Sequence, residues 1–233
     1  MVGGLLDPAD LVCRASRRHV GSLASRSFTP AESLAYEVLV ANPLAVVLAD
    51  VVSDELTGRS VLDVGCGGGT IARVIARGGR QVVGVDAAAS QVARFNRHAV
   101  TDAVTATRAP AEELPFGDGR FDSSYSTCAY KHWTNQVGGL REMSRVTRSG
   151  GRVVVVELDG GSDAESFSHF ASRSRVPSAL KGLYIWYTMR AAIAIAPTRD
   201  SLYDAMVGAG LCDVHVERLG NQPFLVATAR TSN

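Results

Sequence analysis

A glycine-rich stretch follows a carboxylate in the first third of the chain. Residues 61–64 (Val-Leu-Asp-Val) have the apolar character of a buried strand, and glycines follow at positions 65, 67, 68 and 69. Glycines allow a tight turn and let a ligand approach the backbone without a side chain in the way. The helical pattern that begins near Ile71 adds first-turn N–H groups and the positive end of a helix dipole. These features predict the nucleotide-binding corner of a Rossmann-like α/β sheet.

Asp63 indicates which kind of nucleotide binds at this corner. It stands two residues before the first glycine, Gly65. A carboxylate in this place repels the pyrophosphate of a dinucleotide but attracts a cationic ammonium group. A lone Gly-x-Gly match to the dinucleotide fingerprint carries little weight beside it. The residue therefore disfavours NAD as the ligand.

A second carboxylate, Asp86, closes the predicted strand 81–86 and stands 21 residues beyond Gly65. This is near the spacing at which an acidic residue of a Rossmann fold reaches the ribose hydroxyls. One carboxylate can accept a hydrogen bond from each of the two hydroxyls. The alternative is an aspartate that only caps the helix after the strand. Its place after the glycine stretch favours the ribose contact.

The run Asp-x-Gly-x-Gly-x-Gly across 63–69 resembles motif I of the class I S-adenosylmethionine-dependent methyltransferases, of the small-molecule, methyltransferase domain 11-like type. The run Ala-Pro-Ala-Glu-Glu-Leu-Pro-Phe at 109–116, followed by Phe-Asp at 121–122, resembles the family's Gly-Asp-Ala-Glu-x-Leu-Pro-Phe and its next strand. Residues 140–151 look like the family's Leu-Arg-Glu-x-x-Arg-Val-Leu-Lys-Pro-Gly-Gly, with Ser149 in place of proline. The resemblance covers roughly residues 57–160 and implies S-adenosylmethionine as cofactor and S-adenosylhomocysteine as product.

The resemblance also implies which residues hold the cofactor. Asp63, the glycines and the Ser126 carbonyl would bind the methionine end and Asp86 the ribose, whereas Gln91 and Ala111 would lie at the adenine. The whole expected set is Asp63, Gly65, Cys66, Gly67, Gly69, Asp86, Ala87, Gln91, Ala111, Glu112 and Ser126.

Pro110 departs from the family pattern, because it occupies the position of an aspartate that accepts a hydrogen bond from the adenine amino group. Proline cannot accept that bond, although Ala111 still offers its backbone N–H to the ring. We expect cofactor binding to survive with a loss of about 0.5–1.5 kcal/mol, the magnitude of one hydrogen bond.

The segment 127–133 should border the reacting methyl group, because ligands of open α/β sheets lie beyond the carboxyl ends of the strands. It resembles the family's Leu-His-His-Trp segment, with Tyr130 and Lys131 replacing the leucine and the first histidine. His132 is the candidate general base, since imidazole titrates near neutral pH. The alternative is a helix-start or core histidine beside Trp133. Cys128 is expected to pack in the core rather than to act as a nucleophile.

The region after the fifth predicted strand holds most of the remaining aromatic residues. In many enzymes of the family such an insertion forms a lid over the substrate, and we expect a helical lid over residues 161–200. The predicted substrate contacts are Tyr130, Lys131, Tyr184 and Tyr187, with His169, Arg173 and Arg175 as further candidates. The alternative is that these aromatic side chains only pack helices onto the sheet. An aromatic lid favours an apolar or aromatic methyl acceptor.

The surrounding pattern predicts the fold class α/β, with a Rossmann-like, seven-stranded, mostly parallel sheet, helices on both faces and an antiparallel last strand. The expected strands are 61–64, 81–86, 104–107, 121–126, 152–158, 213–219 and 223–229. The expected helices between them are 70–77, 87–100, 136–148 and 200–208. We expect a single domain, 1–233, that consists of a helical cap (1–56), a cofactor-binding core (57–160), the lid (161–200) and a closing helix and strand pair (201–233).

The N-terminal segment contains five basic residues among small polar ones: Arg14, Arg17, Arg18, His19 and Arg26. They are interpreted either as a contact for an anionic substrate group or as the solvated face of an N-terminal helix, and the second interpretation is the simpler. Thr29-Pro30 is a helix start, with a hydroxyl cap followed by proline in the first turn. A second helix is expected after Pro43.

Composition excludes several classes of protein. The chain has 233 residues, 46% hydrophobic and 20% charged, with a net charge of +1, so its overall field does not recruit nucleic acid or an anionic membrane. Its four cysteines form no Cys-x-x-Cys pair, which argues against a zinc site or a disulfide framework and fits a reducing cytoplasm. No signal peptide is expected, and the longest apolar run, 183–197, is too short to span a bilayer.

The predicted function is methyl transfer from S-adenosylmethionine to a small, apolar or aromatic acceptor at oxygen or carbon, by an in-line displacement that depends on positioning. The expected partner is the small-molecule acceptor, and a homodimer is left open. Neither nucleic acid, membrane nor metal is expected. Two alternatives remain: a fold relative that does not transfer methyl, which Pro110 and Lys131 keep open, and an RNA methyltransferase, which only the N-terminal arginines support.

Overall fold

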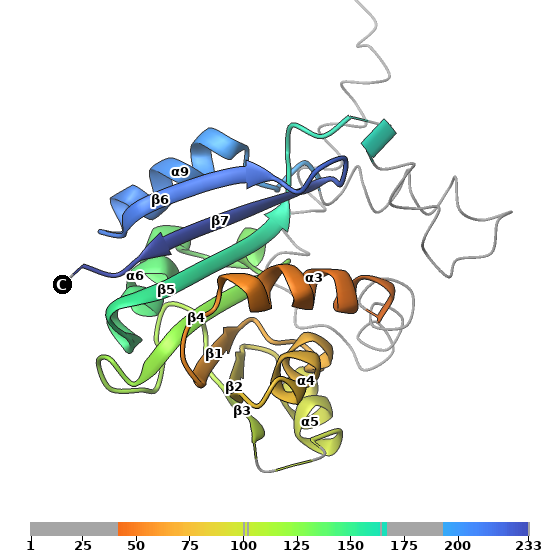
Figure 1. The fold of residues 1–233 in the computed structure, drawn as a ribbon, viewed down its shortest axis with the longest axis vertical. Coiled ribbons are helices and arrows are strands. Elements are labelled where there is room, and N and C mark those ends of the chain that lie inside the picture. Colours follow the sequence, from red (N-terminus) through yellow and green to blue (C-terminus); the bar gives the residue numbers. More distant parts are fainter. Residues whose placement is uncertain (1–41, 100, 102, 164, 167–192, 233) are drawn as a thin grey trace, which may run out of the picture.

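One seven-stranded sheet organises the molecule (Figure 1). The computed structural model describes residues 42–99, 101, 103–163, 165–166 and 193–232. The sheet has the strand order β3-β2-β1-β4-β5-β7-β6. Its strands are β1 Ser60–Val64, β2 Gln81–Asp86, β3 Val104–Arg108, β4 Phe121–Thr127, β5 Thr147–Leu158, β6 Cys212–Arg218 and β7 Phe224–Arg230.

The sheet is mostly parallel, as predicted. Strand β1 pairs in parallel with β2 and β4, while β3 and β5 continue the parallel pairing on either side. Strand β7 runs antiparallel to both β5 and β6 and closes the sheet. The chain crosses from the β3 edge back to β4 beside β1, so the strand order reverses between β1 and β4. Such a reversal leaves a crevice at the carboxyl ends of the two strands, which is where open α/β sheets bind ligands.

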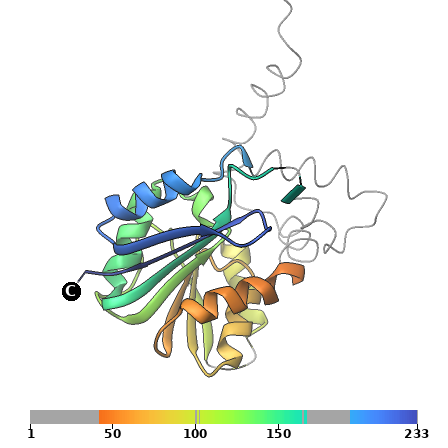
Figure 2. The same cartoon turned by 45° about the horizontal axis from the view of Figure 1, so that its top comes forward.

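Helices cover both faces of the sheet, which confirms the predicted layering (Figures 1 and 2). Helices α3 (Asn42–Glu55), α4 (Thr70–Arg77) and α5 (Ala89–Arg97) contribute to the apolar cluster on one face. Helices α6 (Gln136–Val146) and α9 (Arg199–Gly208) contribute to the cluster on the other. A short 3-10 helix, η2, spans Tyr130–His132 after β4.

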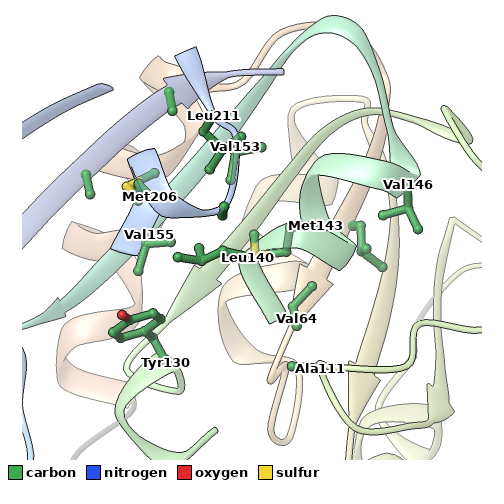
Figure 3. Packing of buried hydrophobic residues seen from close by; sticks show 14 of the residues in the cluster. Val64, Ala111, Tyr130, Leu140, Met143, Val146, Val153, Val155, Met206 and Leu211 are labelled. Atoms are coloured by element: carbon green, nitrogen blue, oxygen red, sulfur yellow. The ribbon is translucent and has the colours of Figure 1, made fainter. Parts of the chain in front are cut away.

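Two apolar cores result, because the central strands are buried on both sides. On the α6 and α9 face, Val153 and Val155 of β5 pack in one cluster with Leu140, Met143 and Met206 (Figure 3). The intervening strand residues face the other cluster, whose members include Val61, Ile75, Phe95, Val154 and Val156. Alternate residues of β5 therefore serve opposite cores.

The sequence assigned several element boundaries correctly and misplaced one junction. Strand β2 and helix α4 begin and end where expected, and the helix predicted over 87–100 is shorter, at Ala89–Arg97. The prediction that a helix continues to residue 148 and that strand five begins at 152 was wrong. Thr147 is already extended and pairs with Phe121, and its hydroxyl donates to Ser124 Oγ at 2.8 Å. These tertiary partners end the helix at Val146.

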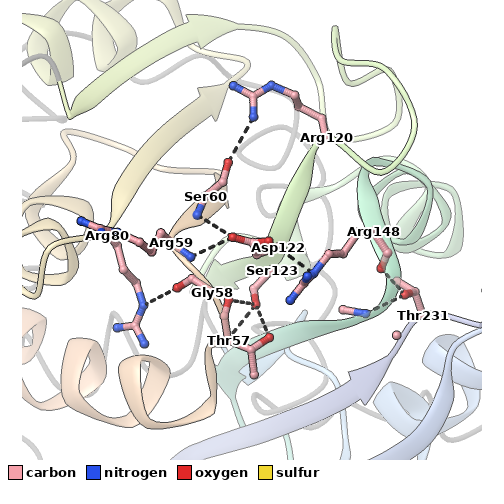
Figure 4. Close-up of polar contacts among 12 residues, drawn as sticks. Thr57, Gly58, Arg59, Ser60, Arg80, Arg120, Asp122, Ser123, Arg148 and Thr231 are labelled. Carbon is pink, nitrogen blue, oxygen red and sulfur yellow. Dashed lines mark hydrogen bonds and ion pairs between the residues drawn. The ribbon is translucent and has the colours of Figure 1, made fainter.

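Polar contacts fix the amino ends of β1 and β4 to each other (Figure 4). Asp122 Oδ2 accepts the backbone N–H groups of Arg59 and Ser60 at 2.8 and 2.9 Å. The Ser123 hydroxyl donates to the Thr57 carbonyl at 2.8 Å and accepts the Thr57 N–H at 3.0 Å. These bonds set the pairing of the two strands whose opposite ends form the crevice.

The segments predicted to cap and cover the crevice lie largely outside the described residues. This applies to the basic N-terminal residues and the first predicted helix, and to Tyr184, Tyr187, His169, Arg173 and Arg175 of the predicted lid. Within the described ranges every helix is too short or too polar to traverse a lipid bilayer. In the same ranges, no three His, Cys, Asp or Glu side chains gather in a group that suits a metal ion.

Two side chains of helix α6 hold the loop before β4 through hydrogen bonds. Arg145 donates to the carbonyls of Phe116 and Leu114 at 2.8 and 3.1 Å and to the carboxylate of Asp118 at 2.7 Å. Glu142 holds the Arg145 guanidinium and accepts the Leu114 N–H at 2.9 Å. Glu142 and Arg145, which belong to the stretch 140–151 that resembles the family pattern, thus hold the loop that carries Ala111.

Replacing Arg145 with methionine removes three hydrogen bonds to this loop while keeping an apolar side chain on the helix. We expect the free energy of unfolding to fall by about 2 kcal/mol, since the guanidinium is partly exposed and each bond is discounted accordingly. Urea denaturation measures the change. Arg141→Met, on the same helix with one bond to the Gly208 carbonyl, is the matched control and should lose clearly less. Equal losses in both variants contradict this role of Arg145.

Candidate functional site

The glycine turn after β1 has one open position between two packed ones. Gly65, Gly67 and Gly69 all have left-handed backbones, with φ of 79°, 51° and 78°. A Cβ on Gly65 would lie 2.2 Å from the Ala129 Cβ, and one on Gly69 would lie 2.5 Å from the Phe95 ring. A Cβ on Gly67 would meet nothing within 4 Å. Gly67 is therefore the point at which a ligand can approach the turn closely.

Asp86 ties this turn to the end of β2. Its Oδ2 accepts the Gly67 N–H at 2.9 Å and its Oδ1 accepts the Ala88 N–H at 2.8 Å. Burial raises the pKa of Asp86, and the two N–H donors oppose that rise. A carboxylate has about four acceptor positions, so after these two bonds it retains capacity for the hydroxyls of a sugar. The helix-capping alternative and the ribose contact are thus compatible at this residue.

Asp63 is buried at the centre of the site, with 1% of its surface exposed. The Tyr125 hydroxyl of β4 donates to its Oδ2 at 2.8 Å, whereas Oδ1 is buried without a hydrogen-bond partner among the described residues. Desolvation raises the pKa of Asp63 to about 7; the Tyr125 bond lowers it and the Asp86 charge raises it further. An unpaired buried carboxylate oxygen is costly, and a ligand that carries an ammonium group would satisfy it.

The residues expected at the adenine lie beside the ribose candidate. The Ala109 N–H donates to the Asp86 carbonyl at 3.2 Å and so brings the loop that carries Ala111 next to Asp86. Gln91, in the first turn of α5, is 7% exposed, and Ala111 is equally buried. Pro110, which precedes Ala111 in the loop after β3, is exposed.

Other members of the expected cofactor set have local partners. Glu112 accepts the Asn135 N–H at 2.9 Å and so supports the start of α6. The Ala87 carbonyl accepts a bond from the Arg108 side chain at 3.1 Å. Cys66 is buried, and its N–H, like that of Gly65, donates to the Val85 carbonyl. The Ser126 side chain is fully buried on β4 with an unpartnered Oγ in the described structure.

A buried ion pair supports the loop that follows β4. Lys131 Nζ lies 2.7 Å from Glu157 Oε1 at the end of β5 and donates to the Cys128 carbonyl at 2.8 Å. Glu157 also accepts the backbone N–H groups of Lys131 and Leu158. Cys128 itself has a left-handed backbone with φ of 54°, which is uncommon for a residue other than glycine. The pair therefore holds the loop in a conformation that the chain does not adopt readily.

The candidate base and the neighbouring aromatic residues lie on this loop. Tyr130 is 1% exposed and packs edge-on against Trp133, with ring centroids 5.4 Å apart. The His132 side chain is exposed, and desolvation by the surrounding protein, followed by the Lys131 charge, lowers the pKa of its imidazole. The imidazole is therefore neutral at neutral pH and able to accept a proton. Burial raises the pKa of the Cys128 thiol to about 12, which makes it a poor nucleophile.

Sequence reasoning missed two residues of this region, Tyr125 and Glu157. Glu157 follows the apolar run 153–156 in the same way that Asp86 follows the strand before it, so this repeated pattern could have indicated it. Nothing in the sequence marks Tyr125, because its partner Asp63 depends on the pairing of β1 with β4. Lys131, for which a substrate contact is expected, forms a buried ion pair with Glu157.

The sequence of this chain is similar to sequences of known methyltransferases. A family model described as a methyltransferase domain matches residues 62–155. A ubiquinone biosynthesis O-methyltransferase from Alkalilimnicola ehrlichii is 30% identical over 148 residues, which cover 62% of this chain and 60% of that protein. A ubiquinone/menaquinone biosynthesis C-methyltransferase from Hahella chejuensis is 30% identical over 170 residues, which cover 66% of this chain and 68% of that protein. The chain thus spans less than two thirds of the first relative and just over two thirds of the second.

A solved structure with a similar fold is phosphoethanolamine N-methyltransferase 2 from Haemonchus contortus in complex with S-adenosyl-L-methionine. It has a TM-score of 0.65 and 17% sequence identity, over 91% of this chain and 60% of that one. At this identity the likeness concerns the fold.

Alanine substitutions at Gly65 and Gly67 test which glycine is required for packing and which is required for ligand binding. Gly65→Ala introduces both a clash with Ala129 and a strained backbone, so we expect the free energy of unfolding to fall by about 2–4 kcal/mol. Gly67→Ala introduces the backbone strain alone, about 1–2 kcal/mol. Its methyl group occupies the open face, so S-adenosylhomocysteine should bind at least about tenfold more weakly in calorimetry. Unchanged affinity in a folded Gly67→Ala protein contradicts the assignment.

The raised pKa of Asp63 predicts how cofactor binding depends on pH. The ammonium group of S-adenosylhomocysteine prefers the ionised carboxylate, and protonation below a pKa of about 7 removes it. Affinity should therefore fall about tenfold for each pH unit between about 7 and 5, as measured by calorimetry. Asp63→Asn should bind weakly at every pH and lose this slope. If the affinity of Asp63→Asn still falls with pH in the same way, the titrating group is not Asp63.

Proposed function

Since the chain belongs to the S-adenosylmethionine-dependent methyltransferases, we propose that it transfers a methyl group to a small, apolar or aromatic acceptor at an oxygen or carbon atom. Two observations carry the proposal: Asp63 Oδ1 is buried without a partner among the described residues, and a Cβ on Gly67, in the turn that follows β1, would meet nothing within 4 Å. Two relatives with the names of O- and C-methyltransferases of ubiquinone or menaquinone biosynthesis support an acceptor with a quinone-like or phenolic ring.

Six residues of this chain would form the cofactor site. Asp63 Oδ1 would accept the ammonium of the methionine end, together with the Ser126 carbonyl, and Gly67 would leave room for it. Asp86 would use its remaining acceptor capacity for the ribose hydroxyls. Gln91 and the Ala111 N–H would lie at the adenine ring. When bound, S-adenosylmethionine supplies a methyl group activated by its attachment to a positively charged sulfur.

The acceptor would bind at the loop after β4, where His132 would take its proton. The neutral imidazole has a free acceptor for the proton, but desolvation and the adjacent Lys131 charge lower its pKa and make it a weaker base than a free histidine. Because Lys131 is engaged by Glu157 and Tyr130 is buried, we propose that both support the loop rather than contact the acceptor directly. Most of the acceleration would come from holding two reactants in line.

The first experiment is calorimetry with S-adenosylhomocysteine and, separately, with NAD. Micromolar binding of the first and none of the second supports the cofactor assignment. Incubation with methyl-labelled S-adenosylmethionine and a panel of hydroquinones, phenols and apolar carbon acids then identifies the acceptor class. If S-adenosylhomocysteine binds but no labelled product forms with any acceptor, the alternative of a cofactor-binding relative without methyl transfer gains support. If S-adenosylhomocysteine fails to bind, Pro110→Asp tests whether the missing adenine contact is the cause.

His132→Ala gives the matching prediction for the chemical step. With a hydroxyl acceptor we expect turnover at saturating substrate to fall about 10²–10⁴-fold, the usual contribution of a general base, while affinity for S-adenosylhomocysteine stays unchanged. His215→Ala on the exposed face of β6 is the control and should keep full turnover. Full turnover in His132→Ala leaves positioning as the only source of acceleration.

The same proposal includes a single-domain enzyme, 1–233, that works in the cytoplasm on a diffusible small molecule. Analytical ultracentrifugation decides between a monomer and a homodimer.

A further inference from the structure

The contact between Asp63 and Tyr125 joins two strands at the point where the strand order reverses. The two residues are paired across β1 and β4, and both are buried, with 1% and 0% of their surfaces exposed. The Tyr125 hydroxyl donates to Asp63 Oδ2 at 2.8 Å. Their surroundings are apolar, since Tyr125 belongs to the cluster that contains Val61, Ile75 and Val154. Two polar groups in such a place need a compensating role, because apolar residues would fill it at lower cost.

The bond uses only half of the carboxylate. One oxygen of Asp63 is saturated by the phenol, and the other has no partner in the described part of the chain. The donor is also neutral: an arginine or lysine in its place would cancel the negative charge, whereas a phenol fixes the orientation of the carboxylate and leaves its charge available. The remaining ionisable neighbours are Asp86, which is an acid, and Cys66, whose thiol pKa is raised by burial. Neither donates a compensating positive charge.

We propose that Tyr125 is a positioning residue for the cofactor, which holds Asp63 through Oδ2 so that Oδ1 accepts the ammonium group of the methionine end. The inference rests on the proposed binding of S-adenosylmethionine at Asp63. In this arrangement the ligand supplies a positive charge that the described residues do not place at Asp63, so both carboxylate oxygens have partners in the complex. The phenol also favours the ionised carboxylate before the ligand arrives.

Tyr125→Phe removes the hydroxyl and keeps the ring that fills the core. At pH 7 we expect S-adenosylhomocysteine to bind about tenfold or more weakly in calorimetry, as for the loss of a hydrogen bond to a charged group. The midpoint of the pH dependence of binding should move upward by about one unit, because the remaining influences on Asp63 all disfavour its charge. A purely structural tyrosine would change the stability but not this midpoint.

Thr147→Val is the matched control. It removes another buried hydroxyl bond of β4, the one from Thr147 to Ser124 at 2.8 Å, with little change in side-chain volume. It should lower the melting temperature but leave both the affinity and the midpoint at the parent values. The proposal is overturned if Tyr125→Phe keeps the parent affinity and midpoint, or if Thr147→Val shifts them equally.

A second variant covers the case in which Tyr125→Phe does not fold. Incorporation of 3-fluorotyrosine at position 125 preserves the shape and strengthens the donor, and because burial raises the pKa of Tyr125 well above its usual value, the phenol keeps its proton. The binding midpoint should then move below that of the parent; an unchanged midpoint overturns the proposal. If the parent protein itself fails to bind S-adenosylhomocysteine, the proposed function fails together with this inference. If the parent protein binds S-adenosylhomocysteine but changes at position 125 alter neither the affinity nor the midpoint, the inference about Tyr125 fails and the proposed function stands.

Discussion

The burial of a carboxylate at the point where the strand order reverses is the constraint on which the site depends. Asp63 is removed from water between β1 and β4, where an ionised group is stable only if its oxygens are satisfied. The protein satisfies one oxygen with the Tyr125 phenol and leaves the other. An unfilled acceptor of this kind, in the strand that leads into a turn with open space at the Gly67 Cβ position, is the basis of the proposal that the crevice takes a ligand with a positively charged end.

Three strands of the sheet end in acids, and the structure treats each acid differently. Asp86 is held by two backbone N–H groups, which fix the glycine turn and the start of α5 to the end of β2. Glu157 forms an ion pair with Lys131 and accepts two backbone N–H groups, and these contacts stabilise the loop after β4. Asp63 receives neither a cation nor a backbone donor among the described residues. Acidic residues at similar places in three strands therefore differ in their partners: Asp86 has two backbone donors and spare acceptor capacity, Glu157 forms an ion pair, and Asp63 has one phenol donor.

The loop after β4 connects the cofactor corner to the expected acceptor side. Ala129 approaches Gly65 so closely that a side chain there would clash, and the Lys131–Glu157 pair holds the left-handed backbone at Cys128. The candidate base His132 is consequently fixed relative to the glycine turn through packing and one ion pair. A departure from the family pattern at Lys131, which by sequence suggested a different chemistry, is explained by this supporting role.

The fold class, the family and the candidate corner for the ligand could be predicted from the sequence, because these follow from local patterns. Apolar strands that end in an acid, glycines at a turn and a helix after them are encoded in a few consecutive residues around Asp63 and Asp86. The partners of these acids come from the tertiary structure, since Asp63 and Tyr125 are 62 residues apart and Lys131 and Glu157 are 26 apart. The tertiary structure also decided that Thr147 leaves the helix for the sheet. Such contacts depend on which strands become neighbours and in what register, and a single sequence carries no local signal for either.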